Sequence, residues 1–284
     1  MNKILTLIFV LFALIMPIAA QSFLQMGLDI DGEAAEDESG TSVCMPDGNT
    51  IAIGAYLNDG SSLNIGHVRI YSWNGSEWLQ KGEDIEGEAD QDRLGWSLDM
   101  PDNNTIAIGA YLNDGSEINS GHVRIYNWNG SAWIQKGADI DGEAADDRSG
   151  WSVSMPDANT VAIGAYQNGG NGNDAGHVRI YVWNEVAWIQ KGGDIDGEVA
   201  EDLSGHAVSM PDANTVAIGA HRNDAGSYHA GHVRIYFWDG LNWVQKGDDI
   251  DGEAADDYSG SAVNMPDANT VAIGASGNDG NASN

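Results

Sequence analysis

Residues 121–175 read GHVRIYNWNGSAWIQKGADIDGEAADDRSGWSVSMPDANTVAIGAYQNGGNGNDA, and this stretch decides the fold. Nearly everything between Phe23 and Asn284 is a full or partial copy of it. Two motifs recur in steps of 55 residues: WxQKG, which ends at Gly82, Gly137, Gly192 and Gly247, and MPD, which starts at Met45, Met100, Met155, Met210 and Met265. A fixed period of this size indicates a repeat architecture in which each copy forms one structural unit.

Four short strand signals recur in each copy. In the quoted copy they are HVRIYNW (122–128), AWIQK (132–136), WSVSM (151–155) and TVAIGA (160–165). Apolar side chains alternate along the first and fourth, and no window has a helical period. Asn129-Gly130 lies between the first two segments and predicts a two-residue hairpin turn.

Four antiparallel strands per repeat fit one blade of a β-propeller. The sequence therefore predicts an all-β protein, with one repeat domain over residues 21–284. We expect four complete blades and a partial fifth, at about residues 29–83, 84–138, 139–193, 194–248 and 249–284. The paired tryptophans of each copy are interpreted as blade-to-blade packing or cross-strand pairs.

The two ends of the repeat region indicate how the propeller could close into a ring. Phe23–Gly27 lies one period before Trp78–Gly82, so we expect the mature chain to open with the last strand of a blade. The sequence stops after the second strand of the fifth copy. An irregular closing blade is one interpretation. We favour a fragment of a larger propeller, because an open end leaves a bare strand edge.

The first twenty residues predict a secretory signal peptide. Lys3 precedes an apolar run from Ile4 to Ile15, and Pro17 and the pair Ala19-Ala20 follow, with cleavage expected after Ala20. The run is shorter than the roughly 20 apolar residues that span a bilayer. We therefore expect a secreted or cell-surface protein with no membrane insertion after cleavage.

The charge balance limits the partners. Lys and Arg number 12 against 43 Asp and Glu, a formal net charge of −31, which argues against binding to nucleic acid and anionic membranes. Of the 43 acidic residues, 28 lie in the loops that join one copy to the next. Alternating strand direction places these loops and the loops after TVAIGA at one end. That end should concentrate cations and attract basic partners.

The unit resembles the FG-GAP repeats of bacterial proteins, which also build the propeller of integrin alpha chains. The resemblance rests on Ser149-Gly150 before WSVSM, on Gly164-Ala165 after TVAIG, and on the tandem GHVRIY segments, and it covers residues 23–284. It implies an exported surface protein with an adhesive role. The proline of the Gly-Ala-Pro motif is replaced by other residues, and the DxDxDG calcium loop is absent, so the calcium sites of that family do not carry over.

Positions that differ between copies are candidates for ligand binding, because scaffold positions must repeat and a binding site need not. Three such slots lie at the acidic end: the residue that opens WSVSM, a residue shortly before it, and the residue after the Gly-Ala pair. They form a predicted aromatic and cationic patch that suits a sugar or a peptide. Ordinary drift at tolerant positions is the alternative interpretation. The candidates are Arg93, Trp96, Tyr111, Arg148, Trp151, Tyr166, His206 and His221.

The sequence requires no cofactor and leaves weak calcium binding open. One ligand set would be Asp139, Asp141, Glu143, Asp146 and Asp147, with its equivalents in other copies. A solvated loop that keeps the protein soluble is the simpler interpretation. His67, His122, His177 and His232 share one repeated slot and are interpreted as structural. Cys44 is interpreted as an unreactive thiol.

The preferred functional hypothesis is an exported, non-catalytic propeller. It would bind an extracellular protein or glycan through its acidic loop face. Near-identity of the copies argues against an enzyme, since catalysis needs residues that break the repeat. The alternatives are a polysaccharide-acting enzyme with a carboxylate pair, and a purely structural surface protein.

Overall fold

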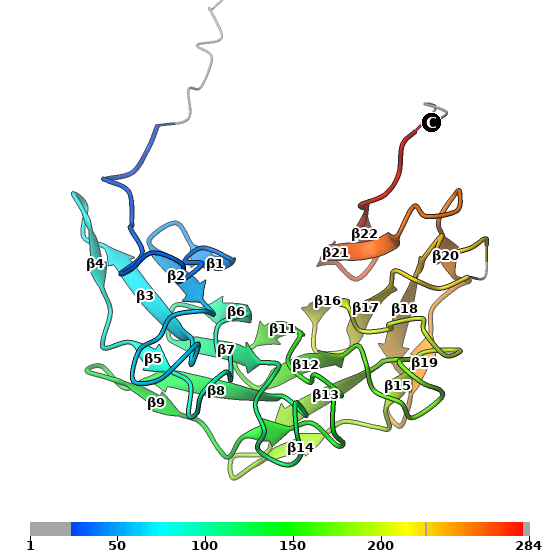
Figure 1. Ribbon diagram of the computed structural model, residues 1–284, viewed down its shortest axis with the longest axis horizontal. Coiled ribbons are helices and arrows are strands. Elements are labelled where there is room, and N and C mark those ends of the chain that lie inside the picture. The colour runs from blue at the N-terminus through cyan, green and yellow to red at the C-terminus, as the bar shows by residue number, and fades with distance from the viewer. Residues whose placement is uncertain (1–23, 225, 281–284) are drawn as a thin grey trace, which may run out of the picture.

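The computed structural model describes residues 24–224 and 226–280, and the predicted signal peptide lies outside this part. The repeats form blades arranged side by side in an open arc (Figure 1). Blade 1 contains β1 (Ser42–Asp47), β2 (Thr50–Ala55), β3 (His67–Trp73), β4 (Trp78–Gln80) and β5 (Ile85–Glu86). Blade 2 contains β6 (Ser97–Asp102), β7 (Thr105–Ala110), β8 (His122–Trp128), β9 (Trp133–Gln135) and β10 (Ile140–Asp141).

The later blades repeat this order. Blade 3 contains β11 (Ser152–Asp157), β12 (Thr160–Ala165), β13 (His177–Trp183), β14 (Trp188–Gln190) and β15 (Ile195–Asp196). Blade 4 contains β16 (Ala207–Asp212), β17 (Thr215–Ala220), β18 (His232–Trp238), β19 (Trp243–Gln245) and β20 (Ile250–Asp251). The partial fifth blade contains β21 (Ser259–Asp267) and β22 (Thr270–Ala275).

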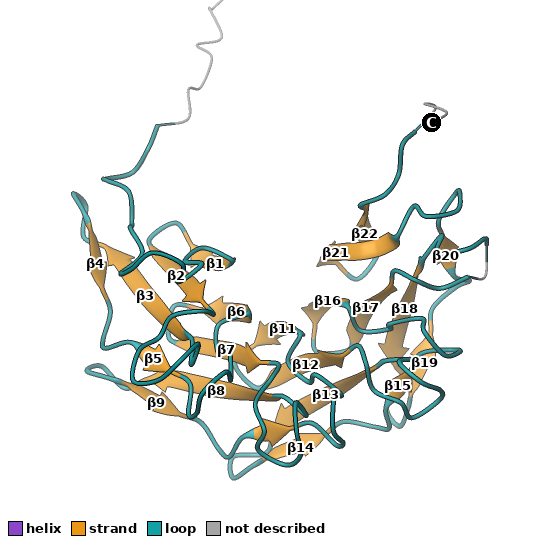
Figure 2. Ribbon diagram, in the orientation of Figure 1, coloured by secondary structure: helices purple, strands orange, loops and turns teal. Residues whose placement is uncertain are grey.

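Within each full blade the strands pair antiparallel in chain order, and the described residues contain no helix (Figure 2). The outermost strand consists of two pieces. In blade 2, β9 pairs with the end of β8 near Trp128, whereas β10 pairs with its start at His122. The predicted all-β propeller architecture, with four full blades and a partial fifth, is confirmed.

Two local predictions need correction. The Asn129-Gly130 hairpin is a four-residue loop, because Trp128 pairs with Trp133. The side-chain oxygen of Asn129 accepts hydrogen bonds from the backbone N–H groups of Ser131 and Ala132, which holds the loop without a two-residue turn. The first described residues, 24–27, form no strand, although they occupy the place expected for the last strand of a blade.

The core lies between neighbouring blades. One cluster joins Val68 and Ile70 of blade 1 to Met100, Ile106 and Ile108 of blade 2, and similar clusters join the next blades. Because each blade is covered on both faces, its middle strands carry apolar residues on both faces, as the sequence shows. Burial of a large apolar side chain contributes about 1.5–3 kcal/mol, so these contacts hold the arc together.

A clasp at the outer edge joins each blade to the next. The indole N–H of Trp133 donates to the carbonyl oxygen of Lys81 at 2.7 Å, and the Lys81 ammonium lies 5.3 Å from the ring of Trp128. The two tryptophan rings are tilted cross-strand neighbours with centroids 5.5 Å apart, which confirms the predicted pairing. Gly82 lies directly beneath Trp128, where a Cβ would be 2.8 Å from the ring. At the start of the chain, Met26 supplies the same carbonyl to Trp78 at 2.9 Å.

A second junction joins the innermost strands. Asp99 accepts a hydrogen bond from the backbone N–H of Met155 in the next blade at 2.7 Å. The Ser154 hydroxyl accepts the backbone N–H of Met210 at 3.0 Å, and the Ser209 hydroxyl accepts that of Met265 at 2.9 Å. The sequence showed only that this slot accepts polar side chains.

Candidate ligand-binding face

The three variable slots place their rings in one row along the inner rim of the arc. We call this set the ring row. Neighbouring rings in it have centroids 4.0–6.1 Å apart, and the row crosses from blade 1 to the partial fifth blade. Its members are Tyr56, Trp96, Tyr111, Trp151, Tyr166, His206, His221 and Tyr258.

The row results from local strand geometry. Trp151 directly precedes β11 and Tyr166 directly follows β12, and antiparallel pairing of these strands brings the two rings to a centroid distance of 4.4 Å. The approach of neighbouring blades then brings Trp96 within 4.5 Å of Trp151. This approach is close because Gly109 of one blade faces the Gly150 carbonyl of the next, where a Cβ would lie 2.1 Å from the oxygen.

Two arginines brace the tyrosines of the row. Arg93 donates from Nη1 to the Tyr111 hydroxyl at 2.5 Å, and Arg148 donates to the Tyr166 hydroxyl at 2.8 Å. Each guanidinium also lies over the ring of its tyrosine, 5.7 and 5.8 Å from the centroid. Nε of both arginines is buried without a hydrogen-bond partner.

The two histidines make one part of the row neutral at pH 7. Burial lowers the pKa of His206, and burial together with neighbouring His206 and Arg222 lowers the pKa of His221 to about 3. The two rings lie 4.0 Å apart. All eight predicted binding candidates therefore lie in the row or contact it directly.

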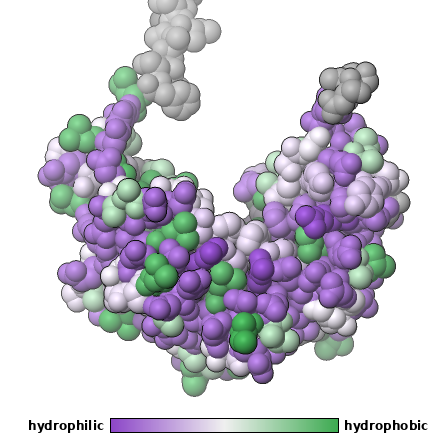
Figure 3. All heavy atoms as spheres, in the orientation of Figure 1, coloured by the Kyte–Doolittle hydropathy of each residue, from purple (hydrophilic) through white to green (hydrophobic). Residues whose placement is uncertain are grey.

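A polar hollow adjoins the row beside Arg148. It has a volume of about 860 Å³ and is formed by residues 143–148 and by the loop after β12, including Gln167, Asn168 and Asp174. Arg148 is the one cationic residue that lines it. The visible face in Figure 3 is mostly hydrophilic, with apolar residues scattered singly.

Backbone strain in the acidic loops is a property of the repeat. Arg93 and Arg148 have φ of 58° and 56°, in the left-handed region. The equivalent residues in the other copies, Glu38, Leu203 and Tyr258, share this conformation at 55–56°. Because unrelated side chains adopt it, the strain belongs to the loop and does not distinguish a ligand site.

The five acids of the calcium expectation take part in separate interactions. Asp139 forms an ion pair with Arg124, and Glu143 forms one with Arg179 of the next blade at 3.3 Å. Asp147 is 2% exposed and accepts hydrogen bonds from the Ala144 N–H and the Asn168 amide. Asp146 accepts a hydrogen bond from the side-chain amide of Asn119. Asp141 is the exposed residue of the two-residue strand β10. Asp147 is therefore a structural residue that shapes the loop.

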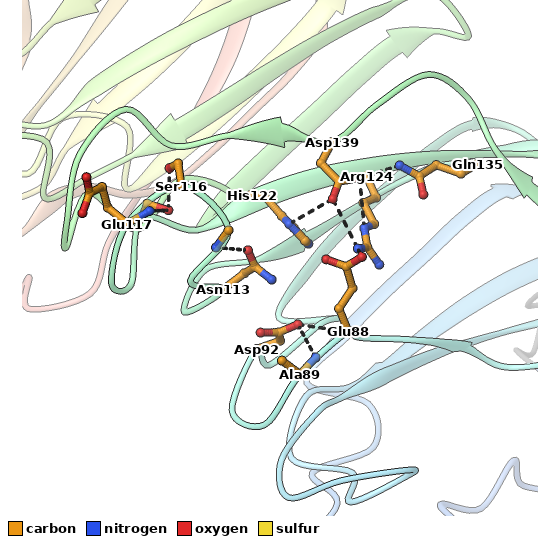
Figure 4. Close-up of polar contacts among 12 residues, drawn as sticks. Glu88, Ala89, Asp92, Asn113, Ser116, Glu117, His122, Arg124, Gln135 and Asp139 are labelled. Atoms are coloured by element: carbon orange, nitrogen blue, oxygen red, sulfur yellow. Dashed lines mark hydrogen bonds and ion pairs between the residues drawn. The ribbon is translucent and has the colours of Figure 1, made fainter.

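A polar cluster that the sequence did not predict lies at each blade junction. In Figure 4, His122 and Arg124 extend from β8 toward Asp139, and Glu88 approaches Arg124 from the preceding loop. Nε of Arg124 lies 3.2 Å from Asp139 Oδ1, and His122 Nδ1 lies 3.7 Å from Asp139 Oδ2. We call this set the Glu–His–Asp cluster. It recurs at Glu33–His67–Asp84, Glu88–His122–Asp139, Glu143–His177–Asp194 and Glu198–His232–Asp249.

The histidine of this cluster differs from the expectation of a hydrogen-bonded structural residue. His122 is 1% exposed, and neither of its ring nitrogens has a hydrogen-bond partner. Burial lowers its pKa, although Asp139, Asp92 and Asp141 oppose this shift. The signal that could have revealed the cluster was in the sequence, because Glu, His, Arg and Asp each recur unchanged in every full copy. Repetition in every copy by itself indicates only a scaffold role.

Comparison of the sequence with protein-family models and with curated proteins gives no match. Solved structures of similar fold include a candidate 6-phosphogluconolactonase from Bacteroides uniformis, with 8% identity and a TM-score of 0.45 over 82% of this chain and 77% of that one. The β-propeller domain of the Trilobed protease from Pyrococcus furiosus has 11% identity and a TM-score of 0.39 over 73% of this chain and 56% of that one. An acylaminoacyl peptidase from Pyrococcus horikoshii has 14% identity and a TM-score of 0.41 over 78% of this chain and 32% of its own.

These structures correct one prediction. We expected a protein that is not an enzyme, yet structures of similar fold carry the names of a lactonase and a peptidase. At 8–14% identity the likeness concerns the fold and assigns no activity to this chain. In the described part of the chain, no helix is long and apolar enough to cross a membrane.

Proposed function

We propose that this protein is exported and binds an extracellular ligand, a glycan or a protein segment, on the ring row. The observation that supports this most directly is the row itself, which breaks the repeat and still runs from blade 1 to the partial fifth blade. Trp96 and Trp151 are partly exposed along it, whereas Tyr111 and Tyr166 are buried at 4% and 8% exposure. Scaffold contacts such as the tryptophan clasp use the same residue in every copy, whereas the row uses Trp, Tyr and His at equivalent positions.

A neutral glycan suits the row best. The C–H faces of sugars carry partial positive charge and stack on the negative faces of aromatic rings. Hydroxyl groups need donors and acceptors beside the rings, and the hollow next to Arg148 supplies both carboxylates and amides. The excess of acids at this end disfavours an acidic ligand and leaves neutral sugars or basic peptides.

Export and a surface location are part of the proposal. They rest on the predicted signal peptide, on the acidic composition, and on the resemblance to FG-GAP repeats in the Gly-Ala and GHVRIY segments. Weak calcium binding by the outer acids, such as Asp146, stays open within the same proposal.

The experiment is a glycan-array screen of the mature chain, followed by titration of each bound glycan and analysis of the mixture for hydrolysis products. Trp151→Ala removes a central ring, and we expect affinity to fall about tenfold or more, since aromatic contacts contribute on the order of 1 kcal/mol each beyond buried area. Trp151→Phe keeps a ring and should retain most of the binding.

The matched control is Phe237→Ala, which removes an aromatic side chain that lies on β18 outside the row. It should leave affinity unchanged. If Trp151→Ala binds as tightly as the native protein while keeping its melting temperature, the row is not the binding surface. If no glycan binds, a glycan is not the ligand. Release of product sugars would show that the same face is catalytic.

A further inference from the structure

In two of the four Glu–His–Asp clusters, the buried imidazole has a free lone pair on one nitrogen and a free N–H on the other. His122 and His232 have no hydrogen-bond partner on either ring nitrogen, and their side chains are 1% and 0% exposed. A buried polar atom without a partner costs about 1–3 kcal/mol. At both positions a ligand atom on Nδ1 would offset this cost.

The carboxylates of each cluster face this nitrogen. One oxygen of Glu88, one oxygen of Asp139 and one ring nitrogen of His122 all lie within 4.8 Å of one another. Ligands that share one zinc ion at about 2.0–2.2 Å lie up to about 4 Å apart, so a small inward shift brings all three into coordination distance. The glutamate is half exposed at 53%, and it can make this shift and give an ion access from solvent.

Arg124 pairs with both carboxylates and is the main objection to a cation at this place. Two features answer it. A carboxylate offers about four lone-pair sites, so an arginine and a metal can share one. The carboxyl groups of Asp92 and Asp141 also act on His122, so the acids around the cluster outnumber its single arginine.

We infer that each Glu–His–Asp cluster binds one divalent transition-metal ion of the zinc type. The ligands are the imidazole of the histidine, the carboxylate of the aspartate in the same blade, and the carboxylate of the glutamate from the preceding loop. One imidazole and two carboxylates suit zinc, manganese or cobalt, whereas calcium takes oxygen ligands alone. Three protein ligands leave a fourth position for water.

The ion would join two blades, because the glutamate and the other two ligands lie on opposite sides of the blade junction. The inference concerns sites apart from the ring row, so it stands or fails independently of glycan binding.

The test uses the mature chain with Zn²⁺ as the probe. After equilibration and gel filtration, elemental analysis should find about four ions per chain, one for each of the four clusters. Glu88→Gln removes one ligand at a half-exposed position and should reduce this number by one. The matched control is Glu117→Gln, an exposed acid in the next loop that belongs to none of the clusters, and it should leave the number at four.

Two measurements separate coordination from loose binding by acidic loops. Millimolar Ca²⁺ should not displace the bound Zn²⁺. Co²⁺ in place of Zn²⁺ should shift imidazole proton resonances, and His122→Gln should remove one set of them. The inference is wrong if Zn²⁺ does not remain bound, if Ca²⁺ displaces it, or if Glu88→Gln binds as many ions as the native chain.

Discussion

A single polar slot on the innermost strands shows how one side chain can join two blades. Ser154 is buried, and its hydroxyl accepts the backbone N–H of Met210, which lies 56 residues further along the chain. Asp99 fills the same slot in the preceding blade and accepts from both Met100 and Met155. The sequence could reveal that the slot is polar. Its partner is a backbone group, which no residue pattern identifies.

Ser154→Ala should destabilise the protein by about 1–3 kcal/mol, because the Met210 N–H stays buried and loses its acceptor. The measurement is the free energy of unfolding in urea. Ser131→Ala is the control, since Ser131 lies in an exposed hairpin loop, and it should cost well under 1 kcal/mol. Equal stability of the two variants would show that the hydrogen bonds between the innermost strands of neighbouring blades contribute nothing to stability.

Cys44 should be an unreactive thiol in the folded protein. Burial and the neighbouring carboxylate of Asp99 raise its pKa to about 12. Because the thiolate is the reactive form, alkylation by iodoacetamide at pH 8 should be roughly a thousandfold slower than for an ordinary cysteine. The unfolded protein in guanidinium should react at the ordinary rate. Fast labelling of the native protein would show that half-burial and Asp99 do not suppress the thiolate.

At the scale of elements, the tryptophan clasp depends on a glycine in the left-handed region. Gly137 has φ of 82°, and a Cβ there would lie 2.7 Å from the ring of Trp183 in the next blade. Gly247 has the same conformation, at φ of 83°, but no atom lies within 4 Å of its Cβ position. These two glycines separate the cost of backbone strain from the cost of a clash.

Gly137→Ala and Gly247→Ala should both pay about 1–2 kcal/mol for the left-handed backbone. Gly137→Ala should cost about 1–3 kcal/mol more, because the added methyl group pushes the Trp183 ring out of place. Thermal melts or urea titrations of the two variants measure the difference directly. If both lose the same stability, the clasp between blades 2 and 3 is not tightly packed.

The strands could be predicted because alternation and period are local signals, and β7 and β12 follow them closely. The hairpin was misjudged because Asn129 acts through its side-chain oxygen and not through a two-residue turn. This also explains why Glu185 can replace the glycine in blade 3, where it adopts φ of 76°.

The ring row and the Glu–His–Asp clusters differ in how far the sequence alone reveals them. Variation between copies identified Trp96, Trp151 and Tyr166, since departures from a repeat are visible in one sequence. The clusters are built from residues that do not vary, on segments 17–51 residues apart, such as Glu88, His122 and Asp139. Only the register of neighbouring blades brings such residues together.

For the whole molecule, the charge distribution opposes compactness. The chain carries 43 acids and 12 basic residues, and 28 of the acids lie in the loops that join one copy to the next, along the whole arc. The ion pairs of Arg124 with Asp139 and Glu88 are partly shielded from salt, because Arg124 is 6% exposed while the two carboxylates are 26% and 53% exposed. Added salt therefore acts mainly on repulsion between exposed acids and much less on attraction within the clusters.

We expect the melting temperature to rise with salt. The Debye length falls from about 30 Å at 0.01 M to about 8 Å at 0.15 M, so repulsion between neighbouring acidic loops is largely screened over this range. Thermal melts at increasing concentrations of sodium chloride and of choline chloride measure this rise in melting temperature. An equal rise in both salts shows that charge screening is responsible. The double variant Asp90→Asn with Glu253→Gln removes two exposed acids, and it should melt higher at low salt and respond less to added salt. A melting temperature that falls with salt would mean that exposed ion pairs outweigh the repulsion, and that the acidic end stabilises the arc.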